Sequence, residues 1–182
     1  MQHLRLQEKE KQLYPLILIF YMLDYKVINN FLPKKIHKKI LQTMTAGNFQ
    51  WYYCDSGGNQ KDKERYYFVH IFKSDKINSD FWNPIIVPVL EKFKPKEIFR
   101  VRGNLTPREN KNYQTAKHKD ENFKHMVAIY YVNTNNGYTF IEDKVKVPSV
   151  ANSCLFFNGK YKHRAVSQTD TKTRIIINIT YV

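Results

Sequence analysis

Short apolar runs alternate with polar turns along the second half of the chain, whereas the first half carries longer, helix-like patterns. From about residue 98 onward, the runs are separated by segments rich in Asn, Gly and Pro, residue types that favour turns. The strands predicted there are residues 98–105, 115–120, 126–133, 138–143, 152–158, 162–166 and 173–182, and the turns are 134–137, 142–149 and 158–160. Short strands at this spacing are typical of a two-sheet β-sandwich or jelly roll.

Two helices are predicted before this β region. Residues 31–44 place Ile36, Ile40 and Met44 on one apolar stripe, and a proline stands in the first turn, where its missing N–H is tolerated. Residues 79–93 form the second candidate helix, whose first half we expect to be irregular because it contains two prolines. The order of elements is therefore helices first and a two-sheet β core second.

Aromatic β-type runs occupy residues 49–54 and 65–72, on either side of the polar loop 55–64. The most membrane-like run is residues 13–23, which is too short to span a bilayer and is followed by no signal-peptidase site. We expect this run to form a core strand or a docked helix within an N-terminal extension of residues 1–24. A membrane partner is not expected.

Composition adds that the chain folds and that it is strongly basic. With 182 residues, 42% of them hydrophobic and 15% aromatic, the chain is most simply a single domain, residues 1–182, with its jelly-roll core in residues 98–182. The net charge of +14 is compatible with a nucleic-acid partner, but the basic residues are scattered and follow no zinc-finger or ribonucleoprotein pattern. A diffusely basic surface that reflects AT-rich codons is the alternative.

The cysteine content bears on the compartment. Only two cysteines occur, Cys54 and Cys154, and they form neither a disulfide framework nor a zinc ribbon. A reducing cytoplasm is therefore the expected location. Cys154 lies in an apolar run, where we expect a buried free thiol.

A histidine and an aspartate stand two residues apart, at His118 and Asp120, inside a run of lysines. Most triplets of this kind are solvated mixed-charge loops. On a strand, however, residues i and i+2 point to the same face, so this imidazole and this carboxylate would share one space. His163, on a later predicted strand, supplies a third ligand. Two histidines and one carboxylate form the facial triad of non-haem iron(II) sites, which leaves coordination positions open.

An arginine follows the three candidate ligands in the sequence. Arg174 opens the strongly apolar run that ends the chain. A guanidinium that points into a β-sandwich is costly to bury unless it meets an anion. A dicarboxylate ligand would accept its planar fork through two hydrogen bonds.

With these residues in this order, the chain resembles the iron(II)- and 2-oxoglutarate-dependent dioxygenases, on the prolyl-hydroxylase-like side, and is similar to small phage-encoded members. The resemblance covers roughly residues 98–182 and rests on the stretches HKD, AIYYVNTNNGYTFIED, SVANSCLFFNGKYKHRAV and TRIIINITY. It implies an α+β fold with a double-stranded β-helix (jelly-roll) core and N-terminal helices packed on one sheet. It also implies a cytoplasmic enzyme, in the host cytoplasm if the protein is phage-encoded.

The resemblance implies roles for individual residues. His118, Asp120 and His163 match the catalytic metal triad that holds Fe(II). Arg174 matches the basic residue that binds the distal carboxylate of the cosubstrate 2-oxoglutarate. Oxygen is the second cosubstrate, and ascorbate is a candidate reductant.

Further residues match the cofactor-binding part of the pattern less specifically. Tyr131 corresponds to a tyrosine whose hydroxyl helps to bind the distal carboxylate, although a plain core aromatic is an equal alternative. Asn104 stands on the strand ahead of the triad, where the family often places a polar residue near the cosubstrate, and Arg102 shares its strand face. Asn178 either lines the pocket or serves in strand pairing.

The function implied is hydroxylation of an unidentified substrate, with a prolyl or other residue of a protein or peptide as the first candidate and a small molecule as another. The stretch RENKNYQTAK lacks the tyrosine and glycine pattern found upstream of the triad in many prolyl hydroxylases, which leaves the substrate open. An oxidative demethylase acting on nucleic-acid bases is an alternative within the same chemistry. A non-catalytic jelly-roll binding or structural protein is the alternative from another class.

The remaining histidines of the folded region are expected to be structural or solvated. His37 falls on the lysine-rich face of the first predicted helix, which indicates a solvated surface side chain. His70 lies within an aromatic strand and should be packed. His125 stands at the junction of a loop and a strand, where we expect it to be exposed.

Overall fold

The computed structural model describes residues 24–55 and 65–182. The predicted element at residues 13–23 lies outside the described residues, as does nearly all of the loop 55–64. The strands are β1 (Tyr25–Ile28), β2 (Tyr52–Asp55), β3 (Tyr66–Lys73), β4 (Ile98–Pro107), β5 (Met126–Tyr131), β6 (Asn135–Ile141), β7 (Val145–Ser149), β8 (Ser153–Asn158), β9 (His163–Val166) and β10 (Thr173–Tyr181).

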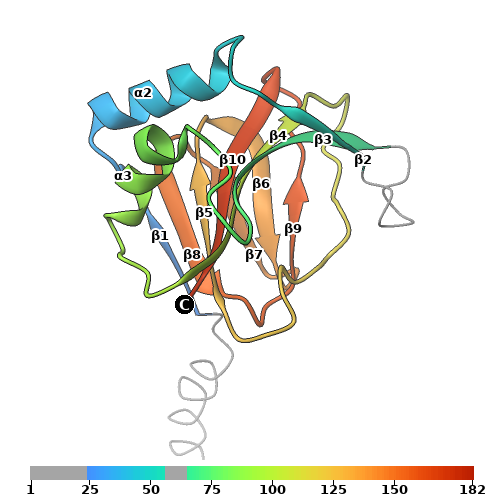
Figure 1. Ribbon diagram of the computed structural model, residues 1–182. Helices are drawn as coiled ribbons and strands as arrows, with labels where there is room; N and C mark the ends of the chain where they lie inside the picture. Colours follow the sequence, from blue (N-terminus) through green and yellow to red (C-terminus); the bar gives the residue numbers. More distant parts are fainter. Residues whose placement is uncertain (1–23, 56–64) are drawn as a thin grey trace, which may run out of the picture.

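These strands form two antiparallel sheets that face each other (Figure 1). The larger sheet has seven strands in the order β1-β8-β5-β10-β4-β3-β2, and the smaller sheet has three in the order β7-β6-β9. The predicted jelly-roll core is confirmed. Strands β1 to β3, from the first half of the chain, extend the larger sheet at both of its edges.

Strand β10 lies at the centre of the larger sheet, between β4 and β5. Its isoleucines explain this place, because a strand that is buried on both faces needs apolar side chains on both. Ile175, Ile177 and Ile179 belong to the cluster on the helix side of the sheet, whereas Ile176 packs in the cluster between the two sheets. The alternation also turns Arg174 toward the space between the sheets.

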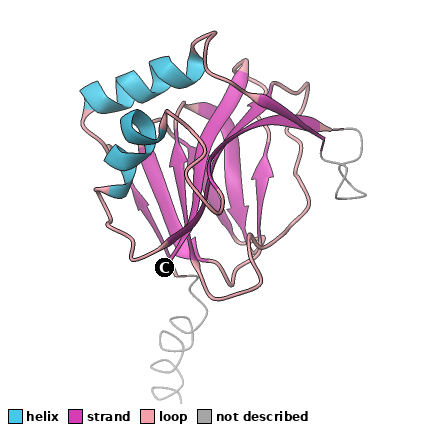
Figure 2. Ribbon diagram, viewed as in Figure 1, coloured by secondary structure: helices cyan, strands magenta, loops and turns pink. Residues whose placement is uncertain are grey.

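Two helices cover the outer face of the larger sheet (Figures 1 and 2). Helix α2 (Lys34–Thr45) buries Ile40 and Met44, as its apolar stripe predicts. The second helix is shorter than predicted, a π-helical turn at Trp82–Ile86 followed by α3 (Val87–Leu90), because its prolines cannot donate the hydrogen bonds of a regular helix.

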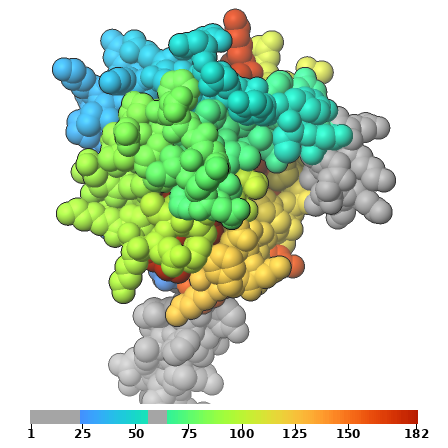
Figure 3. All heavy atoms as spheres, viewed as in Figure 1, coloured from blue at the N-terminus to red at the C-terminus, as the bar shows by residue number. Residues whose placement is uncertain are grey.

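Seen from this side, the segments with α2 and α3 hide most of the central strands (Figure 3). The other face of the larger sheet, its inner face, is turned toward the smaller sheet and lines the space between the two. No helix within the described part of the chain is long and apolar enough to cross a membrane.

Three predicted boundaries in the second half were wrong. The predicted strand 115–120 forms an isolated bridge rather than a ladder, and the predicted turn 134–137 contains the start of β6. The predicted turn 142–149 contains β7, in which Val145 and Val147 alternate with polar residues and Val147 is buried. The proline of β7 suggests a turn in the sequence, but an edge strand tolerates it.

Two histidine predictions were also wrong. His37 is half-buried, and its Nδ1 lies 2.7 Å from the hydroxyl of Tyr130, so it joins the helix to the sheet rather than facing water. His125 is 2% exposed, because Gly159 leaves room for its ring. The packed position of His70 and the buried free thiol of Cys154 are confirmed.

The contact between Gly159 and His125 gives a stability prediction. A Cβ atom at Gly159 would overlap the imidazole of His125, so we expect Gly159→Ala to lower the free energy of unfolding by about 1–3 kcal/mol. Gly47→Ala is the matched control, since a Cβ there meets no atom within 4 Å. Urea unfolding followed by circular dichroism measures both. Equal stabilities of the two variants would contradict this account of the His125 site.

Candidate metal centre and adjoining pocket

An isolated β-bridge brings two histidines together. The backbone N–H of His118 donates to the carbonyl of His163 at 2.9 Å, and the N–H of His163 donates back at 2.8 Å. Residues that exchange both hydrogen bonds stand directly opposite each other and project their side chains to the same side. The two imidazole rings accordingly lie with their centroids 4.6 Å apart.

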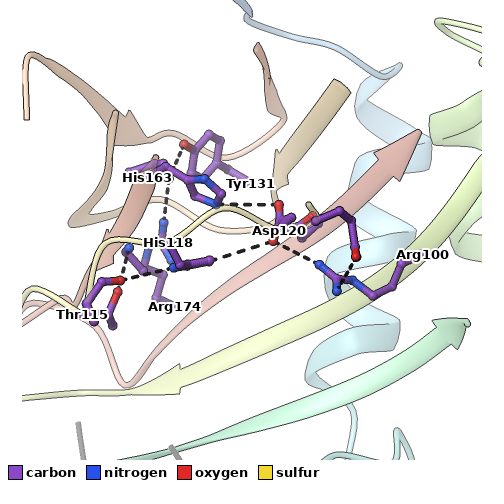
Figure 4. A network of polar contacts seen from close by, with 12 residues as sticks. Arg100, Thr115, His118, Asp120, Tyr131, His163 and Arg174 are labelled. Atoms are coloured by element: carbon purple, nitrogen blue, oxygen red, sulfur yellow. Dashed lines mark hydrogen bonds and ion pairs between the residues drawn. The ribbon is translucent and has the colours of Figure 1, made fainter. Parts of the chain in front are cut away.

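Asp120 completes a cluster of three metal-ligating side chains (Figure 4). Its Oδ1 lies 3.9 Å from Nε2 of His118, and its Oδ2 lies 3.7 Å from Nε2 of His163. All three ligand atoms lie within 4.8 Å of one another. Adjacent ligand atoms about 2 Å from a shared ion are separated by about 3 Å, so the cluster needs only a small contraction to hold a divalent metal.

Hydrogen bonding and burial favour the metal-binding form of both histidines. His118 can donate from Nδ1 to the carbonyl of Ala116 at 3.2 Å, which leaves the lone pair of Nε2 facing Asp120. Burial lowers the pKa of His163 to about 4, against the opposing effect of the Asp120 charge. At neutral pH the His163 imidazole is therefore neutral, as a metal ligand must be.

Two residues of the larger sheet orient the carboxylate of Asp120. Arg100 on β4 donates from Nη2 to Oδ1 at 3.1 Å, and Asn178 on β10 donates to Oδ2 at 3.3 Å. Arg100 also contacts Glu121 at 2.7 Å. Sequence reasoning missed Arg100, although its alternation with Arg102 along the same strand was a signal for a shared, inward-facing side.

A pocket of about 440 Å³ opens beside this cluster. His118 and Asp120 line it, and so do Asn104, Arg174 and Asn178. Four of these five residues are predicted from the sequence to belong to the site. For Asn178 the sequence allowed two alternatives, pocket lining and strand pairing. The structure assigns it both, because it also stands opposite Arg102 in the β10–β4 ladder.

Arg174 is buried in the pocket wall, with 2% of its surface exposed. Its Nε donates to the hydroxyl of Ser149 at 2.9 Å and its Nη2 to the hydroxyl of Thr139 at 3.3 Å. No described carboxylate forms an ion pair with it. Burial lowers the pKa of this guanidinium, while Tyr131 acts in the opposite direction. A buried cation held only by neutral hydroxyls is suited to bind an external anion.

Ser149 and Thr139 were not identified from the sequence. Ser149 ends β7, a segment whose proline favours a turn, and Thr139 alternates with aromatic residues on β6. Both come from the smaller sheet, whereas Arg174 comes from the larger one. The hydroxyls therefore fix the guanidinium between the two sheets.

Tyr131 lies beside this arginine, outside the set of residues that line the pocket. The Arg174 guanidinium lies 5.9 Å from the centre of the Tyr131 ring, and the Tyr131 hydroxyl donates to Thr139 at 2.8 Å. Burial raises the pKa of Tyr131 to about 12, so the phenol is neutral at physiological pH. The geometry shows a side chain that positions Thr139, and binding of a ligand by Tyr131 stays a prediction.

No protein-family model and no curated protein matches the sequence. The fold, in contrast, is found among solved structures. A prolyl hydroxylase from Trichoplax adhaerens, in complex with a peptide fragment of the hypoxia inducible factor oxygen degradation domain, matches with a TM-score of 0.65 and 15% identity over 97% of this chain and 91% of that chain.

Two further structures extend this likeness. The viral collagen prolyl hydroxylase of Paramecium Bursaria Chlorella virus-1, solved with 2OG, matches with a TM-score of 0.55 and 13% identity over 87% of this chain and 96% of that chain. The non-heme alpha ketoglutarate dependent epimerase SnoN, from nogalamycin biosynthesis, has a TM-score of 0.61 and 15% identity over 95% of this chain and 83% of that chain. At such identities the likeness establishes a shared fold.

The cluster predicts one divalent metal ion per chain. We expect His118→Ala to weaken Mn(II) binding by more than about 100-fold, because even the loss of an outer-shell partner costs 10–100-fold in affinity. The fold should persist, since the His118 side chain is 50% exposed and its removal leaves no cavity. Calorimetric titration measures the affinity.

His37→Ala is the control for this measurement, because the His37 side chain forms a hydrogen bond with Tyr130 and does not contact the cluster. It should bind Mn(II) as the wild type does. Undiminished binding by His118→Ala would show that the metal lies elsewhere.

Proposed function

We propose that this protein is an Fe(II)- and 2-oxoglutarate-dependent dioxygenase. The observation that carries the proposal is a His-Asp-His cluster at one end of a pocket and a buried, carboxylate-free Arg174 in the wall of the same pocket. The shared fold of the 2-oxoglutarate oxygenases supports the same conclusion. A structural jelly roll has no need of a buried guanidinium without an anionic partner.

Strand β10 connects the metal cluster with the Arg174 end of the pocket. Asn178 contacts Asp120, and Arg174 lies four residues away on the same strand face, about 13 Å along the backbone. A short dicarboxylate that bound the metal with one end would direct its other end along β10 toward the guanidinium. The planar fork of Arg174 binds the far carboxylate, while Ser149 and Thr139 fix its orientation.

The cluster fits iron(II) by its donor set, since two imidazoles and one carboxylate on one face leave positions open for other ligands. When bound, Fe(II) with 2-oxoglutarate and O2 supplies an oxidant for a C–H bond, with succinate and CO2 as coproducts. The protein's own residues position the reactants. Arg100 and Asn178 hold the Asp120 carboxylate, and the neutral imidazole of His163 is shielded from water by burial.

For the substrate, we propose a prolyl or other residue of a peptide. The likeness to the Trichoplax prolyl hydroxylase, which was solved with a peptide fragment, supports this choice. The lining of the pocket also includes Asp55 and Tyr66, at the end of the β2–β3 hairpin. Because β2 is an edge strand, an extended peptide could lie along this part of the pocket.

Arg174→Lys tests the assignment of the cosubstrate. We expect the KM for 2-oxoglutarate to rise at least about tenfold, because a lysine keeps the charge but loses the two-pronged hydrogen bonding. Fe(II) affinity should stay within about twofold, since Arg174 does not contact the cluster. The readout is Fe(II)-dependent formation of succinate from 2-oxoglutarate, followed by NMR. Full turnover in His118→Ala, or an unchanged KM in Arg174→Lys, would refute the proposal.

A further inference from the structure

Strand β4 places a row of polar side chains along the inner face of the larger sheet. Arg100, Arg102, Asn104 and Thr106 all line the pocket, as alternate residues of one strand should. Between them, Gly103 faces the opposite side, where a Cβ atom would meet Met44 and Phe72 of the core. Arg100, at one end of this row, contacts Asp120 of the metal cluster, and the other three residues continue the row along the pocket.

Three of the four arginines in the pocket lining have partners. Arg65 pairs with Glu109, Arg100 pairs with Asp120 and Glu121, and Arg174 is held by two hydroxyls. These contacts account for their orientation. Each of the three therefore has a structural role in addition to any role toward a ligand.

Arg102 differs from these three. Its guanidinium forms no hydrogen bond or ion pair with any residue in the described ranges 24–55 and 65–182, and its Nε is shut off from solvent without a partner. A buried donor left unpaired in this way costs free energy, which an incoming anion would recover. The pocket thus contains one guanidinium that its own residues leave unsatisfied.

The position of Arg102 separates it from the far end of the cosubstrate. In the β4–β10 ladder, Arg102 stands opposite Asn178, the residue that donates to Asp120. Thr106, four residues further along β4, stands opposite Arg174. Arg102 therefore lies at the metal end of the pocket, about 13 Å of strand away from the position of Arg174.

Tyr67 on β3 also lines the pocket, close enough to Arg102 for the charge of the guanidinium to affect the pKa of the phenol. Burial raises the pKa of Tyr67 to about 12, and the positive charge of Arg102 acts in the opposite direction. At neutral pH the Tyr67 side chain is a neutral hydroxyl. A guanidinium with a neutral hydroxyl beside it offers hydrogen-bond donors to an anion.

We propose that Arg102 binds an anionic group, a carboxylate or a phosphate, of the primary substrate and thereby places the substrate at the metal end of the pocket. The inference rests on the proposed function, because it takes the metal and 2-oxoglutarate to occupy the cluster and the Arg174 end. Arg102 is then a specificity-determining residue. Substrates that carry an anion near the oxidised carbon should be preferred over neutral analogues.

The test uses the full chain loaded with Mn(II) and 2-oxoglutarate, so that no turnover occurs. N-acetyl-L-proline, its neutral amide and methyl phosphate serve as probes, and the paramagnetic broadening of their methyl proton signals reports proximity to the metal. We expect broadening for at least one anionic probe and at least fivefold less for the amide. Whichever anionic probe shows the larger broadening tells whether Arg102 prefers a carboxylate or a phosphate.

The variants are Arg102→Gln, Arg102→Lys and Arg108→Gln. Arg108 is exposed and lies outside the pocket lining, so its variant controls for the loss of one positive charge. We expect Arg102→Gln to lower the paramagnetic broadening of the anionic probe's signal at least fivefold. Arg102→Lys should lower this broadening less, and Arg108→Gln should leave it unchanged. If Arg102→Gln does not fold, Arg102→Lys is compared with the wild type. This variant must then lower the broadening of the anionic probe's signal and leave that of the neutral amide unchanged.

Several results would overturn the inference. One is equal broadening of the signals of the anionic probes and of the amide with the wild-type protein. Another is an equal loss of the anionic probe's broadening in Arg102→Gln and Arg108→Gln. A tenfold weaker affinity of Arg102→Gln for 2-oxoglutarate would assign the residue to the cosubstrate instead. Failure of the proposed function looks different, because Mn(II) or 2-oxoglutarate would then not bind the wild-type protein at all.

Discussion

The reciprocal backbone hydrogen bonds between His118 and His163 are the constraint on which the site depends. They tie an otherwise irregular segment to the edge strand β9 of the smaller sheet, and a second bridge between Gln114 and Val166 holds the same segment further along. Each bond contributes only about 1 kcal/mol net, but together they set the separation and direction of two imidazoles. Asp120 follows two residues later and meets Arg100 and Asn178 of the other sheet. The metal cluster is therefore assembled between the two sheets and would be lost if they moved apart.

Arg174 is the second element that spans the sheets, and its burial carries a cost. A guanidinium on β10 contacts Ser149 and Thr139 of the smaller sheet, with no described carboxylate to neutralise it. Desolvation of such a charge is unfavourable unless an anion compensates for it. The fold thus holds an unfavourable feature at the place where a dicarboxylate cosubstrate would remove the cost. The unpaired Arg102 repeats this logic at the other end of the pocket.

The sequence predicted which side chains meet at the metal cluster better than it predicted the local backbone structure that brings them together. The strand alternation that aligned His118 with Asp120 was derived for a regular strand, yet the structure has only a bridge at His118. The order of ligands nevertheless indicated the cluster, because the residue types alone restrict the chemistry. Arg100, Thr139 and Ser149 were missed because their roles arise from contacts between distant strands. His125 was misjudged because its burial depends on a glycine far from it in sequence.

The central claim is that this cluster and pocket hold Fe(II) and 2-oxoglutarate together. Anaerobic titration of the purified apoprotein with Fe(II), followed by 2-oxoglutarate, tests it most directly, since chelation of the iron by the cosubstrate produces a weak visible charge-transfer band. The account predicts a band that saturates at one equivalent and is absent in both His118→Ala and His163→Ala. Iron bound at the cluster with no band on addition of 2-oxoglutarate would contradict it.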